Sequence, residues 1–420
     1  MLLKRMRSIW VGVAGVMALL LAMSASAVEV KDLYKATAVV ADRTDESLRH
    51  GSQEALAEVV IRVCGDSTAL ESYDIRQAMG NPNRYIEQYG FDRITVDNPE
   101  TGLPEPAFEL KVTFNARGIN QLIRRAGLPI WASNRAELLV WLVTDDENGR
   151  RLVNADTDPE LVATLQEQAG RRGLPIAFPL NDLQDQLAVT PGDVWGMFTD
   201  RIQTASERYT PGAVLVGKVY APSAEGRLAN WNLMLDNQQE MLESRGLELA
   251  EVITPAIELS ADKLASKYAV TLGGGDTDFV WLNVQGVETL TDFAQLTAYL
   301  EKLVAIRQAD MGQLQEDQTR FRLYLESNIE NLKQLLALDK KLIEMPIEQP
   351  ELSVSLSALN DQTVIEGDAI ATQPELTGEI EPLIPSLEVF TQIPELSYHW
   401  HRTYSIQPIQ VNQPIQSPEI

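Results

Sequence analysis

The sequence has few of the residues that most often carry chemistry. Among 420 residues there is one cysteine, Cys64, so an internal disulfide is excluded. Cys64 follows Val60, Ile61 and Val63, which predicts a buried position at the end of a helix, where cysteine behaves as a small apolar residue. A nucleophile or an intermolecular bridge remains the alternative interpretation.

Histidine is equally scarce, with three in the chain. His399 and His401 lie two positions apart, so they fit either a weak zinc or copper site on one side of a strand or a solvated aromatic segment. His50 is expected on the polar side of a helix, and a serine hydrolase would have to use it. The sequence contains no G-x-S-x-G and no H-E-x-x-H motif. We therefore predict no catalytic residue, no cofactor or cofactor-binding residue and no metal ligand, and enzymatic activity is left open.

Basic residues are outnumbered, with 35 Lys and Arg against 60 Asp and Glu and a formal charge of −25. A surface this acidic repels nucleic acid and anionic lipid. The pairs Arg124–Arg125 and Arg171–Arg172 are the only candidates for a basic groove. The prediction is that nucleic acid is not a partner.

Aromatic residues make up 6% of the chain, which is low for a sugar-binding cleft. We predict core packing for the tryptophans at 131, 141, 195, 231 and 281, which fall on strand or helix faces. A carboxylate pair for glycoside cleavage is defined by a distance in space, so the sequence leaves it open. Residues 145–147 are three consecutive acids that can bind calcium, but the Asn-Gly that follows predicts a hairpin turn.

One partial match to a phosphate-binding loop occurs at residues 212–218 (GAVLVGK). The next residue is Val219, where Ser or Thr is needed to hold magnesium. The apolar, β-branched interior of the segment predicts a strand instead.

The first 27 residues have the pattern of a secretion signal. Basic residues within the first seven positions precede an apolar stretch at residues 9–23, and residues 25–27 (Ala-Ser-Ala) fit a cleavage site. We predict a mature chain that begins at Val28 in the bacterial periplasm, where a protein with one cysteine fits well. The alternative is an uncleaved anchor. No later run is long and apolar enough to span a membrane, so no transmembrane segment is expected after signal cleavage.

Apolar strands and amphipathic helices alternate along the rest of the chain, which predicts α/β and α+β folds. Residues 138–143 (LLVWLV) and 213–219 (AVLVGKV) read as strands buried on both faces of a central sheet. We expect three small mixed domains in tandem followed by a disordered acidic tail: 28–131 (α+β), 132–272 (α/β), 278–340 (β-α-β-β-α) and the tail at 345–420.

The elements within these domains are predicted from period and cap residues. In the first domain we expect strands at 33–40, 91–96 and 108–114, with helices capped by Thr44, Thr68 and Asn115. In the central domain we expect strands at 138–144, 150–153, 174–178, 213–220 and 230–235, with helices at 159–172, 191–209 and 247–268. In the third we expect strands at 279–284, 306–314 and 319–325, with helices at 289–303 and 328–338.

The tail contains many prolines and acids and sustains no period. Its residues 383–398 alternate apolar anchors with acids. If they bind, an extended form added to a sheet edge of a partner or of this protein is expected, because proline discourages a helix.

Six short blocks of the central domain form a recognisable combination: 138–143 (LLVWLV), 171–175 (RRGLP), 192–196 (GDVWG), 208–209 (RY), 214–219 (VLVGKV) and 231–235 (WNLML). Together they resemble the family named domain of unknown function 2066, uncharacterised proteobacterial envelope proteins. The resemblance covers residues 28–340 and implies no activity and no catalytic residue. In layout the central domain looks like modules of envelope lipoproteins and translocation factors, and the third looks like small domains of secretion-ring proteins.

Two functions from different classes follow. The first is a non-catalytic periplasmic protein that binds other envelope proteins, in an oligomeric state that the sequence leaves unknown. The alternative is a periplasmic hydrolase that cleaves cell-wall or sugar substrates through carboxylates. A pocket holding two or more buried carboxylates with shifted pKa values would favour the hydrolase.

Overall fold

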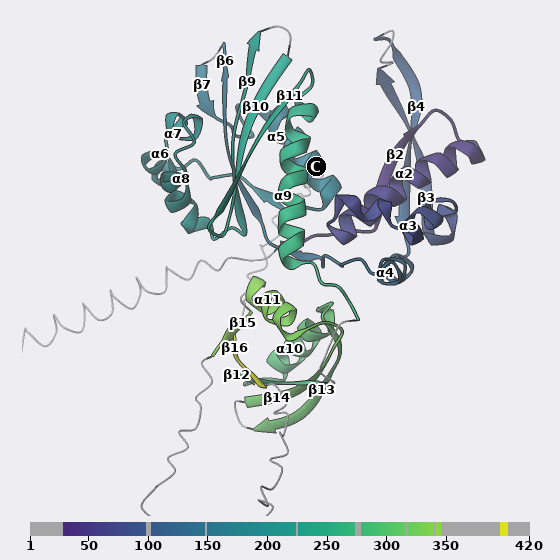
Figure 1. The fold of residues 1–420 in the computed structure, drawn as a ribbon, viewed down its shortest axis with the longest axis vertical. Coiled ribbons are helices and arrows are strands. Elements are labelled where there is room, and N and C mark those ends of the chain that lie inside the picture. The colour runs from purple at the N-terminus through teal and green to yellow at the C-terminus, as the bar shows by residue number, and fades with distance from the viewer. Residues whose placement is uncertain are drawn as a thin grey trace, which may run out of the picture.

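The protein combines helices and strands in several sheets (Figure 1). The computed structural model describes residues 28–97, 102–147, 149–223, 226–273, 279–315, 318–339, 341–345 and 395–401. The predicted signal peptide, residues 1–27, lies outside them, as do residues 346–394 and 402–420 of the predicted tail. No helix in the described part of the chain is long and apolar enough to cross a membrane.

The N-terminal part is a small antiparallel sheet covered by helices. Its elements are β1 (Val28–Glu29), β2 (Lys35–Val40), α2 (Asp45–Cys64), η1 (Ser67–Glu71), α3 (Tyr73–Met79), η2 (Pro82–Tyr85), β3 (Ile86–Asp97), β4 (Pro104–Phe114) and α4 (Ala116–Arg125). The sheet order is β2-β4-β3, and α2 packs on β2 and β4. The predicted caps of two helices are confirmed. Thr44 accepts a hydrogen bond from the amide of Ser47, Gly65 ends α2 at φ 72°, and Asn115 caps α4.

One predicted helix in this part is wrong. Thr68 does not open an α-helix, because Asp66 accepts a hydrogen bond from the amide of Thr68 and caps the short 3-10 turn η1 instead. The following α3 begins after Ser72. The competing side-chain cap one turn earlier decides the local structure.

The central part is a sheet with helices on both faces. Its elements are β5 (Asn134–Arg135), β6 (Leu138–Asp146), β7 (Gly149–Leu152), α5 (Pro159–Arg172), β8 (Ile176–Ala177), α6 (Leu183–Ala188), α7 (Pro191–Trp195), α8 (Thr199–Ser206), η3 (Glu207–Tyr209), β9 (Ala213–Ser223), β10 (Gly226–Leu235), β11 (Gln238–Gly246) and α9 (Leu249–Tyr268). The order is β11-β10-β9-β6-β7, with β8 beside the first half of β6. Strand β5 pairs with β1, outside this sheet.

The apolar run at residues 138–143 of β6 follows from its place between two helical layers (Figure 1). Leu138 and Val140 pack in the core that includes α5 and α9. Leu139 and Trp141 pack in the core that includes α7 and α8, where Trp141 Nε1 donates to Ser206 Oγ at 2.9 Å. Because successive strand residues face opposite sides, a strand covered on both faces has no polar positions.

The helix predicted at 191–209 is broken in the structure. Met197 adopts φ 55°, which ends α7, and α8 starts two residues later. Phe198, predicted on the buried face, is 57% exposed as a result. Strand β11 and helix α6 were not predicted, and β8 is shorter than the predicted 174–178 strand.

The last part has the predicted β-α-β-β-α order. Its elements are β12 (Val280–Gln285), α10 (Leu290–Lys302), β13 (Ile306–Gln315), β14 (Gln318–Leu325), α11 (Ile329–Asp339), β15 (Leu342–Glu344) and β16 (Glu395–Trp400). The sheet order is β13-β14-β12-β16-β15. Residues of α10 and α11 bury the alternate side chains of β12, β14 and β16 on one face.

Strand β16 corrects the prediction that residues 345–420 are disordered throughout. Residues 395–400 lie inside the sheet, parallel to β12 and antiparallel to β15. Leu396, Tyr398 and Trp400 are buried against the helices. The predicted extended form added to a sheet of this protein is therefore found at residues 395–398, although the strand lies between two others and not at an edge.

Removal of residues 346–420 is expected to destabilise this sheet, because it deletes three buried side chains and the only described partner of β15. Burial of each large apolar side chain contributes roughly 1.5–3 kcal/mol. We expect a lower Tm and an earlier urea transition by circular dichroism. Removal of 402–420 alone is the control and should leave both unchanged, whereas equal stability of the two truncations would show that β16 contributes nothing.

Candidate functional site

A buried guanidinium joins the N-terminal and central parts. Arg135 is 0% exposed and stacks on the ring of Trp131, with 3.9 Å from its guanidinium carbon to the ring centroid. Its N–H groups donate to the carbonyls of residues 62, 131, 132, 172 and 173. Arg62 lies in the last turn of α2, and Arg172 is the last residue of α5. Because the carbonyls at a helix C-terminus lack helical partners and carry partial negative charge, one cation satisfies two helix ends.

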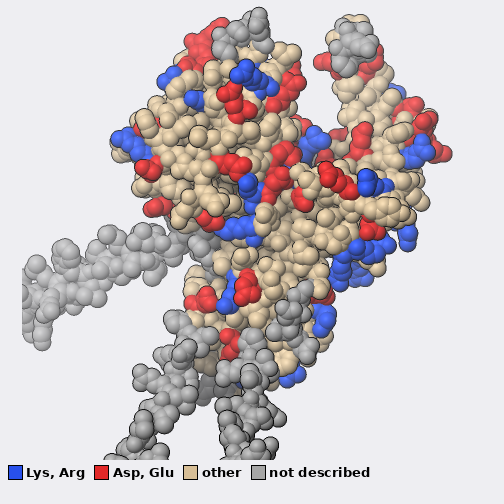
Figure 2. Space-filling view, viewed as in Figure 1, with Lys and Arg blue, Asp and Glu red and all other residues tan. Residues whose placement is uncertain are grey.

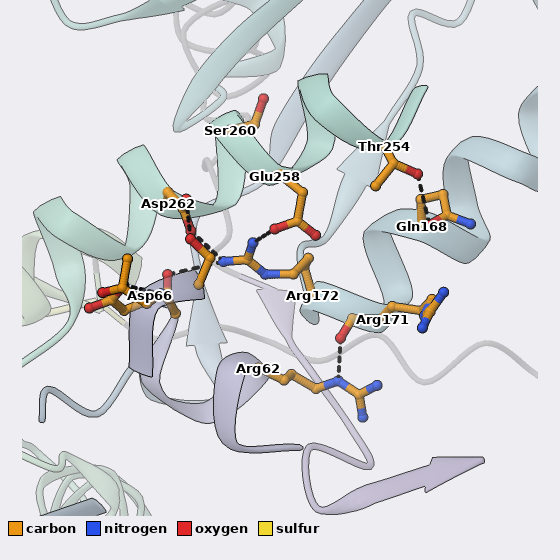
Figure 3. Close-up of polar contacts among 12 residues, drawn as sticks. Arg62, Asp66, Gln168, Arg171, Arg172, Thr254, Glu258, Ser260 and Asp262 are labelled. Carbon is orange, nitrogen blue, oxygen red and sulfur yellow. Dashed lines mark hydrogen bonds and ion pairs between the residues drawn. The ribbon is translucent and has the colours of Figure 1, made fainter. Parts of the chain in front are cut away.

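Arg172 connects the end of α5 with α9 (Figure 3). Its Nη2 donates to Asp262 Oδ1 at 2.6 Å and to the carbonyl of Gly65 at 3.1 Å, and its Nη1 contacts Glu258. The side chain is 4% exposed. Three helices, α2, α5 and α9, are therefore held at one guanidinium.

Arg62 makes the reciprocal contact from α2. Its Nε donates to the carbonyl of Arg171 at 2.9 Å (Figure 3). Its guanidinium also pairs with Glu58. Burial lowers the pKa of Arg62, and the Glu58 carboxylate opposes this shift. Glu58 also pairs with Arg171 at 3.1 Å. Arg171 and Arg172, a candidate pair for a basic groove, are both paired with carboxylates in the structure.

The three arginines also repel one another. Burial, followed by the charges of Arg62 and Arg172, lowers the pKa of Arg135 to about 9. The group stays protonated at neutral pH, since five carbonyls accept its hydrogen bonds. The three arginines thus form a structural junction between α2, α5 and α9.

Cys64 is buried beside this junction, as the sequence predicts. Burial, with a smaller contribution from Asp66, raises the pKa of its thiol to about 12. A neutral thiol is a poor nucleophile. Cys64 lines a cavity of about 450 Å³ between η1 and α9, across which Ser67 Oγ donates to Asp262.

The other basic pair, Arg124–Arg125, ends α4, where positive charge is favourable for the helix dipole. Arg124 also lies 3.6 Å from Glu326. Figure 2 shows acidic and basic side chains interspersed over most of the visible face, with basic side chains gathered near α4. This pair therefore has a structural explanation.

The remaining candidate segments and residues from the sequence lie in a buried strand, in a hairpin and on the surface of a helix. The segment 212–218 lies mainly in β9, where a side chain at Gly217 would collide with Trp231. Asp145 and Asp146 are paired with arginines of β7 across the hairpin. His50 is exposed on α2, 4.0 Å from Glu46. Among the described residues no cluster of three or more His, Cys, Asp or Glu could hold a metal ion.

His399 and His401 lie outside any such cluster as well. His399 is an exposed residue of β16, and His401 follows the strand with its amide bonded to the carbonyl of Lys341. The amide contact extends the pairing of β16 with β15 by one residue.

A groove lies between α6 and α8. It has a volume of about 500 Å³ and is lined by Gln184, Asp185, Ala188, Asp200, Arg201, Thr204, Ala205 and Arg208. Its base is polar and ordered. Asp185 is 1% exposed, and it accepts hydrogen bonds from Arg208 at 3.0 Å and from the Tyr209 hydroxyl at 2.5 Å. Burial and then the bond to Asp185 raise the pKa of Tyr209 to about 12, so its hydroxyl stays protonated.

Leucines project from the same segment into solvent. Leu183 and Leu187 are 71% and 78% exposed and lie one turn apart on α6. Leu180, three residues earlier, is 69% exposed. Leu183 and Leu187 are four residues apart and share one face of α6, whereas Leu180 lies in the loop before that helix. We call these three residues the α6 leucine surface. An exposed apolar surface beside a groove is typical of a protein-binding site.

The groove does not have the carboxylate pair that the hydrolase hypothesis requires. Asp185 is buried, but its carboxylate already accepts hydrogen bonds from Arg208 and Tyr209. Asp200 is exposed. Asp193 is also buried, and hydrogen bonds from Thr190 lower its pKa. The two residues form a capping box in which Thr190 is the N-cap of α7. The groove therefore does not meet the condition of two buried carboxylates with shifted pKa values that would favour the hydrolase.

The sequence contained a signal for α6 that was missed. Asp182 accepts a hydrogen bond from the amide of Asp185, an N-cap three residues before a buried acid. The apolar pair Leu183 and Leu187 has helical spacing, but its exposure depends on how α6 lies against α8.

A model of a family described as a domain of unknown function, DUF8605, matches residues 27–132. The predicted membership of the domain of unknown function 2066 family is wrong, because the matching family is a different one. The blocks that carried that resemblance lie at 138–235, beyond the matched residues. No curated protein matches the chain.

Substitution Arg135→Met tests the junction. It leaves the carbonyls at the ends of α2 and α5 without their donor, and we expect a loss of about 3–5 kcal/mol in the free energy of unfolding. Urea unfolding followed by circular dichroism measures it. The matched control is Arg171→Met, whose side chain is 59% exposed and whose loss should cost less than about 1 kcal/mol. Equal losses in the two variants would contradict the assigned role.

Proposed function

We propose that the protein is a non-catalytic protein of the bacterial periplasm that binds other envelope proteins through the groove between α6 and α8. The observation that supports this proposal is the α6 leucine surface beside a groove of about 500 Å³. Grooves of this size with an apolar border can accept the side chains of a segment of a partner protein.

The groove is held rigid by contacts beneath it. Arg208 bridges Asp182 at the start of α6 to the end of α8, at 2.9 Å. The amide of Leu180 donates to the Tyr209 hydroxyl at 3.0 Å, which fixes the loop that carries the first leucine. A surface that is ordered before binding loses less conformational entropy when a partner docks.

The partner that fits is an amphipathic segment of another envelope protein. Its apolar side would cover Leu180, Leu183 and Leu187. Its polar side would meet the rim of the groove, where Asp200 and Arg201 supply both signs of charge. A helix laid in a groove presents anchors at matching three- and four-residue spacing.

The proposed location rests on the leader pattern of residues 1–27. The proposal also divides the chain into the α+β, α/β and β-α-β-β-α domains at 28–131, 132–272 and 278–340. Separate clusters of buried residues in these parts support this division. Residues 346–394 of the tail remain a predicted disordered segment.

Substitution of Leu183 and Leu187 by Asp is expected to abolish the partner crosslinks made at this surface, because charges replace its apolar anchors. In-cell crosslinking with mass spectrometry measures the recovery of each partner. Leu290→Asp is the matched control, since Leu290 is 83% exposed but begins α10. Loss of the same crosslinks in the control, or retention in the double variant, would refute the proposed surface.

Export gives an independent prediction. The full-length chain should be recovered from the periplasmic fraction with an intact mass that begins at Val28, because residues 25–27 offer small side chains to the signal peptidase. Recovery of a chain that begins at Met1, soluble in the cytoplasm, would overturn the location.

A further inference from the structure

The five-stranded sheet has a second face that its helices do not cover. Buried residues alternate along β12, β14 and β16, and the intervening side chains point away from α10 and α11. No described helix lies over this opposite face (Figure 1).

Strand register arranges this face in rows. Arg322, Trp281 and Glu395 are paired neighbours in one row. The next row is Arg320, Asn283 and Ser397, and the third is Gln318, Gln285 and His399. Side chains directly opposite on adjacent strands lie within contact distance, so polar groups from three strands converge.

Trp281 is partly exposed here, which corrects the prediction that it is a core residue. Two arginines stack on its indole, with 4.3 Å from Arg320 and 5.0 Å from Arg322 to the ring centroid. Phe279 meets the same ring edge-on at 5.7 Å. These contacts hold the indole in one orientation on the sheet surface.

A polar pocket of about 270 Å³ lies along the second and third rows. It is lined among others by Asn283, Gln285, Gln318, Arg320 and Ser397. Glu395, also in its wall, accepts hydrogen bonds from Asn283 Nδ2 at 2.6 Å and from Arg320 Nη2 at 3.1 Å. The wall is therefore arranged before any ligand binds.

The charge of this wall indicates its ligand. Among the described residues of this wall the one cation, Arg320, is paired with the one carboxylate, Glu395, and the amides and hydroxyls are neutral. A wall with balanced charge provides no compensation for an ionic ligand. Amide side chains both donate and accept hydrogen bonds, which matches sugar hydroxyls, since each hydroxyl also does both.

We propose that this face binds a neutral carbohydrate, with hydroxyl groups held by Asn283, Gln285 and Gln318 of the pocket wall. The pocket volume suits one or two sugar residues, and the open sheet lets a longer glycan continue across the strands. This site is separate from the α6–α8 groove and does not depend on the function proposed for it.

Isothermal titration of the full chain with cellotriose, maltotriose and N,N′,N″-triacetylchitotriose tests the proposal. At least one trisaccharide should bind, with an affinity that is insensitive to salt because the sugar is neutral and the charges of the pocket wall are paired. Asn283→Ala and, separately, Gln318→Ala should each weaken binding about tenfold. Gln318 is exposed at the start of β14, so its variant is expected to fold even if Asn283→Ala does not.

Gln166→Ala is the matched control, since Gln166 is an exposed amide on α5 far from this sheet in sequence and structure. It should bind as the unchanged protein does. Failure of all three trisaccharides to bind, or equal binding by the Gln318→Ala variant, would overturn the proposal. Salt-sensitive binding of oligogalacturonate in place of the neutral sugars would overturn it as well, because it would identify an anion site.

Discussion

The ends of α2 and α5 meet at Arg135, and the arrangement of the N-terminal and central parts depends on that contact. Helix C-termini repel each other when they approach, because both carry partial negative charge. Arg135 removes the conflict by donating to carbonyls of both helices. A side chain at Gly173 would collide with the same guanidinium, so even the residue that ends α5 is selected by this contact.

The five-stranded sheet is completed by residues distant in the chain. Strand β16 lies between β12 and β15, and β15 pairs with no other described strand. Glu395 then bonds to Asn283 and Arg320 on the open face, while Leu396, Tyr398 and Trp400 fill the helical side. The same six residues therefore contribute to stability and to the polar pocket.

The two proposed binding surfaces differ in chemistry for a physical reason. The α6–α8 groove lies beside exposed leucines. Leu183 and Leu187 belong to the short helix α6 and point away from the core into solvent. The open sheet face is flat, and each of its positions is set by strand register. The first surface suits an apolar protein segment, and the second suits a ligand that hydrogen-bonds to several strands at once.

Local sequence patterns were sufficient to predict many of the helices and strands. Thr44 and Asn115 cap helices where the sequence predicted them, and the helix predicted at 289–303 is found as α10. The apolar run of β6 predicted a strand covered on both faces, because that pattern depends only on side-chain alternation.

Features that depend on distant contacts were not predictable. The break at Met197 and the exposure of Phe198 depend on packing against the sheet, and Trp281 became a surface residue because only one face of its sheet is covered. The sequence by itself determined the caps Thr44 and Asn115, the alternation of strands and helices and the acidic charge. Only the tertiary structure decided the place of β16, the burial of three arginines and the two surfaces, because each needs residues far apart in the chain to meet.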